Sequence, residues 1–95
     1  MYVLVVDDQP DVVKGILSGV NWARLKVDRA FGAHSGEEAR RILQTQQIDI
    51  LLCDIEMPGE NGLQFFSWVR ERFPEIKCSF LTAHADFSYE IGRAH

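Results

Sequence analysis

Short runs of consecutive hydrophobic residues alternate along this chain with longer segments in which hydrophobic residues recur every three or four positions. A continuous run rich in β-branched and aromatic residues is typical of a strand that is covered on both faces. The second run is the least regular of them, because Asp28 and Arg29 interrupt it. The predicted strands are residues 2–6, 27–31, 48–53 and 78–81.

The segments between these strands have the period of amphipathic helices. Pro10 stands in the first turn of the first segment, where its missing N–H does no harm. Ser35 and Glu38 form a predicted capping box at the start of the second helix. Pro74 ends the third helix, and a fourth is expected to begin at Asp86. The apolar helix positions are Val12, Val13, Ile16, Leu17 and Val20, then Ala39, Ile42 and Leu43, then Leu63, Phe66, Val69 and Phe73 on one stripe of residues 62–73.

Strands and helices in alternation predict βαβ units, in which the strands run parallel and helices cover both faces of the sheet. The predicted fold class is therefore α/β with a doubly wound parallel sheet. A chain of 95 residues that is 46% hydrophobic and 25% charged has the composition of one globular domain. We expect residues 1–95 to form that single domain.

Charge and cysteine content narrow the classes of function. The formal net charge of -4 at pH 7 leaves no overall basic surface, so this segment is not expected to bind DNA itself. Cys53 and Cys78 lie inside apolar runs without metal-ligand spacing, which predicts buried free thiols. The sequence contains no long apolar span and no signal peptide, and a cytoplasmic protein is expected.

Polar residues that follow the predicted strands are the candidates for chemistry. Asp7 and Asp8 follow the first strand, Asp54 follows the third and Thr82 follows the fourth. In an open parallel sheet the functional crevice lies outside the carboxyl ends of the strands. Each Asp taken alone is better explained by turn chemistry, such as the Pro-Gly turn after Asp54. The recurrence at several strand ends favours a functional site.

Carboxylates that converge in this way repel one another unless a cation offsets their charge. Mg²⁺ takes hard oxygen ligands and keeps several waters, so one or two carboxylates and a backbone carbonyl are sufficient to bind it. A carboxylate beside such an ion can act as a nucleophile and form an acyl phosphate. Asp54 is the predicted nucleophile, and Thr82 is expected to lie in the same layer.

Three motifs closely resemble the receiver domain of two-component response regulators. They are "VLVVDDQP" at residues 3–10, "DILLCDIEMPGENG" at 49–62 and "SFLTAHADF" at 79–87, and together they span nearly the whole chain. The resemblance implies a flavodoxin-like fold with strand order 2-1-3-4-5. It also implies a signalling module and not an enzyme.

The same resemblance assigns roles to individual residues. Asp54 is expected to accept phosphate from a sensor histidine kinase. Asp7 and Asp8 would organise Mg²⁺, with Asp8, Asp54 and the main-chain carbonyl of Glu56 as ligands. Thr82 would be the switch hydroxyl that moves toward the phosphoryl group.

The residues after the fourth strand, "AHADFSYE", are similar to receivers fused to AraC-type helix-turn-helix regulators. The parent protein is therefore expected to regulate transcription through a DNA-binding output domain beyond this chain. A receiver also has a fifth strand that ends in a phosphate-binding Lys, and Lys14, Lys26 and Lys77 do not fit that position. We expect strand order 2-1-3-4 without the fifth strand and last helix, and self-association or element exchange through the open edge of the fourth strand.

Two other functions are compatible with parts of the pattern. A pseudo-receiver would interact with proteins and never take phosphate. An aspartyl-phosphate phosphatase or phosphotransferase normally uses an Asp-x-Asp pair, whereas Ile55 and Glu56 follow Asp54.

Residues around the candidate site have expected structural roles. Met57 is predicted to pack in the core, and Gly62 to let the next helix begin close to the site. Arg40 and Arg41 are predicted to lie on a solvated helix face.

Overall fold

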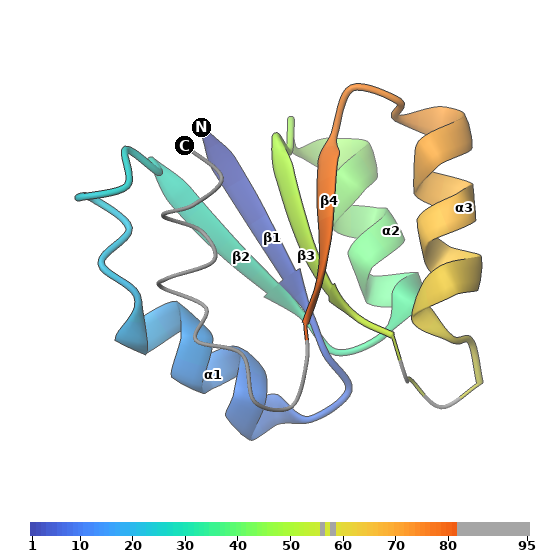
Figure 1. Ribbon diagram of the computed structural model, residues 1–95, viewed down its shortest axis with the longest axis horizontal. Coiled ribbons are helices and arrows are strands. Elements are labelled where there is room, and N and C mark those ends of the chain that lie inside the picture. Colours follow the sequence, from blue (N-terminus) through green and yellow to red (C-terminus); the bar gives the residue numbers. More distant parts are fainter. Residues whose placement is uncertain (56, 58, 82–95) are drawn as a thin grey trace.

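The computed structural model describes residues 1–55, 57 and 59–81 (Figure 1). The predictions for Glu56 and Thr82, and for a helix from Asp86, lie outside the described residues. The elements are β1 (Tyr2–Val6), α1 (Pro10–Gly19), β2 (Arg29–Ala33), α2 (Gly36–Thr45), β3 (Ile50–Asp54), α3 (Gly62–Arg72) and β4 (Lys77–Leu81).

The strands form a parallel four-stranded sheet in the order β2-β1-β3-β4, which confirms the predicted order 2-1-3-4 and the α/β class. Helix α1 covers one face of the sheet, and α2 and α3 cover the other (Figure 1). The register places Val6 opposite both Ala33 and Cys53. The carboxyl ends of β1, β2 and β3 therefore lie together at one edge of the sheet.

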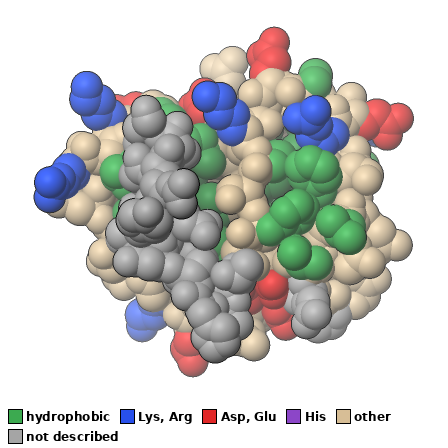
Figure 2. Space-filling model, viewed as in Figure 1, with side chains coloured by type: hydrophobic (Ala, Val, Ile, Leu, Met, Phe, Trp, Pro, Cys, Tyr) green, Lys and Arg blue, Asp and Glu red, His purple; other side chains and the backbone are tan. Residues whose placement is uncertain are grey.

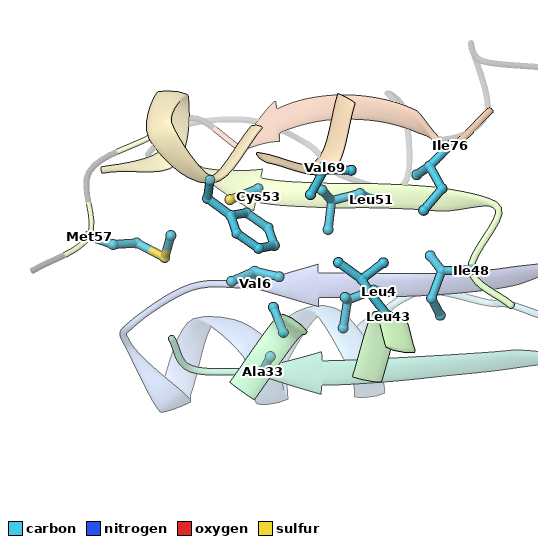
Figure 3. Packing of buried hydrophobic residues seen from close by; sticks show 12 residues of the cluster. Leu4, Val6, Ala33, Leu43, Ile48, Leu51, Cys53, Met57, Val69 and Ile76 are labelled. Carbon is cyan, nitrogen blue, oxygen red and sulfur yellow. The ribbon is translucent and has the colours of Figure 1, made fainter. Parts of the chain in front are cut away.

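The apolar run of β1 contributes to both sides of the sheet, as a doubly covered strand requires. Leu4 and Val6 belong to the cluster under α2 and α3 (Figure 3). Val3 and Val5 belong to the cluster under α1. All of them have no exposed surface. Burial on both faces fixes the position of the β1 carboxyl end, where Asp7 and Asp8 follow.

Strands β2 and β3 begin two residues later than the apolar runs predicted. Val27 and Ile48 are buried, but they precede the strands. The N–H of Val27 donates to the carbonyl of Trp22 at 2.9 Å, and the N–H of Ile48 donates to that of Gln46 at 3.1 Å. These side chains pack into the core from the turns that lead into the strands, so burial alone does not make them strand residues.

The buried stripe of α3 differs from the predicted one. Phe65 and Val69 have no exposed surface and Gly62 is buried, whereas Leu63 is 55% exposed. Two stripes that differ by one position both carry apolar residues at helical spacing. The prediction was right for Val69 and wrong for Leu63, because the helix packs against the sheet through Gly62 and Phe65.

The helix caps agree with the sequence in part. Ser35 accepts the N–H of Glu38 at 3.1 Å, as predicted for the start of α2. The Glu38 carboxylate accepts the N–H of His34 at 3.1 Å, one residue before the cap, so the reciprocal half of the box is displaced. A complete capping box joins Asn61 and Gln64 at the start of α3.

Strand β4 is the last strand of the sheet among the described residues. Apolar side chains gather over α3 and β4 on the face seen in Figure 2. Phe66 and Phe80 are half-buried and their ring centroids lie 5.3 Å apart. None of the helices within the described part of the chain has the length and apolar composition that crossing a bilayer requires.

Candidate functional site

Three carboxylates meet at the carboxyl edge of the sheet. Asp7 and Asp8 follow β1, and Asp54 is the last residue of the neighbouring strand β3. One carboxylate oxygen from each residue lies within 4.8 Å of the other two. The structure therefore brings together the three acidic residues that the sequence predicted for the site.

The backbone fixes Asp7 most firmly. Its N–H donates to the carbonyl of Ala33 at 3.1 Å, which extends the contact between β1 and β2 by one residue. Its Oδ1 accepts the N–H of Gln9 at 2.9 Å, just before α1 begins at Pro10. Asp7 is 6% exposed, whereas Asp8 and Asp54 are half-buried and accessible from the edge of the sheet.

The electrostatic state of the cluster follows from this packing. Burial raises the pKa of Asp7, the hydrogen bond from Gln9 opposes that shift, and the negative charges of Asp54 and Asp8 raise the pKa further. The folded chain therefore resists full ionisation of the three carboxylates. A bound cation would remove that resistance.

Replacing Asp7 with Asn is expected to raise Tm by a few degrees at pH 7 without divalent cations. A carboxyl group whose pKa is raised by folding binds protons better in the folded chain, so stability falls as pH rises through the window between its ordinary and raised pKa. Asn carries no charge and can still accept the Gln9 N–H. The gain should therefore shrink when melts are repeated at a pH below the ordinary Asp pKa.

The control for this measurement is Asp11→Asn, an exposed acidic residue in the first turn of α1. Its carboxylate interacts favourably with the helix dipole, so its loss should lower Tm slightly. A lower Tm for Asp7→Asn would contradict the view that repulsion within the cluster destabilises the fold.

The donor set of the cluster fits a hard divalent cation. Three carboxylates supply only oxygen atoms, and Mg²⁺ prefers such ligands together with several waters. The neighbouring Cys53 does not add a thiolate, because burial raises the pKa of its thiol to about 12. Its Sγ donates to the carbonyl of Asp54 at 3.3 Å. Both cysteines are free, as predicted, although Cys78 is only half-buried.

The loop after Asp54 returns directly to the site. The N–H of Gly62 donates to the carbonyl of Ile55. A Cβ atom at Gly62 would lie 2.2 Å from the carbonyl oxygen of Asp54 and 2.6 Å from the Cα of Ile55, closer than atoms can approach. Gly62 thus lets α3 begin against the site, as predicted. Met57 is 8% exposed within the core cluster, which confirms its predicted packing role (Figure 3).

The sequence interpretation missed one pair of residues near this loop. Arg40 does not lie on a solvated helix face, because both of its terminal nitrogens bind the Glu60 carboxylate, at 2.7 and 2.6 Å. The prediction is correct for Arg41, which forms an exposed pair with Glu37. No signal in a single sequence links Arg40 to Glu60, because the two residues lie on different elements.

Comparisons with known proteins agree with this geometry. The family model for the response regulator receiver domain matches residues 3–93 of this chain. The response regulator protein PilR of Pseudomonas aeruginosa is 30% identical over 88 residues, which is 93% of this chain and 19% of that protein. This chain therefore spans about a fifth of the length of that relative.

Two solved structures are similar to the fold described above. A two component transcriptional regulator AraC from Clostridium phytofermentans is 26% identical with a TM-score of 0.81, over 94% of this chain and 72% of that chain. The REC domain of AraT, a response regulator from Geobacillus stearothermophilus, is 28% identical with a TM-score of 0.79, over 98% and 72%. The first of them confirms the predicted similarity to AraC-type regulators. On the match to residues 3–93, this chain belongs to the response regulator receiver domain family.

Proposed function

We propose that residues 1–95 form one receiver domain that accepts a phosphoryl group on Asp54. The observation that carries this proposal is the convergence of Asp7, Asp8 and Asp54 at neighbouring strand ends, with carboxylate oxygens within 4.8 Å, in a chain of this family. The domain relays the modification as a conformational switch. It undergoes the modification itself and does not turn over an external substrate.

Asp54 is the acceptor for physical reasons. Asp7 is nearly buried and its carboxylate is engaged by Gln9, whereas Asp54 is half-buried at the end of β3. A carboxylate oxygen of Asp54 attacks the phosphorus of a phosphohistidine on a sensor histidine kinase. A P–O bond forms as the P–N bond breaks, and the imidazole nitrogen keeps the electron pair.

Asp8, Asp54 and the main-chain carbonyl of Glu56 would hold Mg²⁺, and Asp7 would support the site from the buried side. The ion supplies positive charge that offsets the phosphoryl oxygens and the carboxylates. Thr82 remains the predicted switch hydroxyl.

The wider setting of the domain is part of the same proposal. The similarity to a two component transcriptional regulator supports a cytoplasmic protein that contacts DNA through a separate output domain. Self-association or element exchange through the edge of β4 stays a prediction, supported by the apolar side chains beside this strand.

The test is to incubate the protein with Mg²⁺ and a small phosphodonor such as acetyl phosphate, and to measure the intact mass. We expect one phosphate per chain, labile in base, and no modification when EDTA is present. An unmodified chain without affinity for Mg²⁺ would favour the pseudo-receiver, and turnover of unrelated phosphoesters would favour a phosphatase.

A further inference from the structure

The loop that joins β3 to α3 is fixed at both ends beside Asp54. At its start, the carbonyl of Ile55 accepts the N–H of Gly62. At its end, Asn61 caps α3 by accepting the N–H of Gln64 at 2.9 Å. Gly62 packs against the carbonyl oxygen of Asp54, so we expect a shift of this loop to reach the backbone of Asp54.

The middle of the loop has two anchors on opposite sides. Met57 points into the core (Figure 3). Glu60 binds Arg40 of α2 through two parallel hydrogen bonds of 2.7 and 2.6 Å. A Cβ atom at Gly36 would lie 2.2 Å from Oε1 of Glu60, so this carboxylate lies against the first residue of α2. The positive end of the helix dipole favours a negative charge at that place.

Arg40 is held from a second direction as well. Its guanidinium carbon lies 4.8 Å from the centre of the Trp68 ring and 5.4 Å from that of Phe65. The side chains of Arg40 and Glu60 are only 27% and 30% exposed. Their hydrogen bonds raise the pKa of Arg40 and lower that of Glu60, so both groups stay ionised. Two parallel hydrogen bonds between half-buried side chains restrict the positions of Arg40 and Glu60 far more than an exposed ion pair would.

We propose that Arg40 and Glu60 are positioning residues, whose ion pair holds the β3–α3 loop against α2 in the form in which Asp54 accepts phosphate. This inference rests on the proposed function of Asp54. The two side chains bind each other, so their effect on Asp54 is transmitted through the backbone of the loop. Small displacements matter for such a role, because a misplacement of about 1 Å remote from the reacting atoms can cost about a hundredfold in rate.

The test is a double-mutant cycle with Arg40→Gln, Glu60→Gln and both changes together. The rate of phosphorylation by acetyl phosphate is measured at saturating Mg²⁺, and Tm is measured in parallel. Each single variant should lower the rate by about tenfold or more. The double variant should be no slower than the slower single variant, because the two residues act as one unit. Arg40→Lys keeps the charge but cannot form two parallel hydrogen bonds with Glu60, so its rate of phosphorylation should lie between those of the wild type and Arg40→Gln.

Arg41→Gln is the matched control, since it breaks the exposed pair with Glu37 on the same helix and should leave the rate unchanged. Additive losses from the two single variants would overturn the role of the pair and assign the effect of Arg40 to its packing on Trp68. Unchanged rates in all variants of a protein that does take phosphate would overturn the positioning role altogether.

Amide hydrogen exchange at Gly62 separates this inference from the proposed function. If the wild-type chain takes no phosphate, the proposed function fails, but exchange still tests the contact. Faster exchange at Gly62 in Arg40→Gln and Glu60→Gln, with β1 unchanged, would support an ion pair that holds the loop. Exchange at wild-type rates would overturn it.

Discussion

Replacing Asp54 with Asn should abolish phosphate uptake and leave the domain folded. Asn has the same shape but an amide in place of the carboxylate, so no acyl phosphate can form. The change also removes one of the three carboxyl groups whose oxygens lie within 4.8 Å of one another, so the affinity for Mg²⁺ should fall too. Intact-mass measurement after incubation with acetyl phosphate and Mg²⁺ should show no modified chain, and circular dichroism should be that of the wild type.

Asp49→Asn is the matched control for Asp54→Asn. Asp49 precedes the same strand at its other end, and its carboxylate accepts the N–H of Tyr2 at 2.7 Å. The Asn side chain keeps a carbonyl oxygen for that hydrogen bond, so phosphate uptake should be unchanged. If Asp54→Asn were modified at the wild-type rate, Asp54 would not be the phosphate acceptor, and Asp8 would be the next candidate.

Replacing Phe65 with Ala should lower the free energy of unfolding by about 3–5 kcal/mol, the usual cost of deleting a buried aromatic ring. Phe65 has no exposed surface, and its ring stacks on that of Trp68 with centroids 6.2 Å apart. Domains of this size have only about 5–15 kcal/mol of stability in total. Urea unfolding should therefore show a large fall in the midpoint.

Leu63→Ala, on the same helix, is the control for that measurement. Leu63 is 55% exposed, so its truncation should change stability by no more than about 0.5 kcal/mol. Equal losses from Phe65→Ala and Leu63→Ala would mean that α3 does not pack on the sheet through Phe65. The two variants thus test which face of α3 packs on the sheet, where the sequence interpretation was wrong for Leu63.

The architecture and the acidic cluster could be predicted from the sequence because both depend on local order along the chain. The apolar run of β1 favours burial on both faces, which a sheet between two helical layers provides. Asp7, Asp8 and Asp54 directly follow such runs. Once the strands are parallel neighbours, their carboxyl ends meet and the carboxylates converge.

Other features were decided by contacts between elements that are distant in the sequence. Val27 and Ile48 are apolar and buried, but their hydrogen bonds belong to turns, so β2 and β3 begin later than hydrophobicity alone indicates. Strand ends depend on which backbone groups pair across the sheet, and a hydrophobicity pattern does not contain that information.

The sequence by itself therefore determined the fold class, the strand order by resemblance, and the three carboxylates that meet at the edge of the sheet. Only the tertiary structure decided which side of α3 is buried, because apolar residues lie at helical spacing on two neighbouring stripes and the packing of Gly62 and Phe65 in the folded chain distinguishes them. Only the tertiary structure joined Arg40 to Glu60, because an ion pair between a helix and a loop depends on their packing in space and leaves no period along the chain.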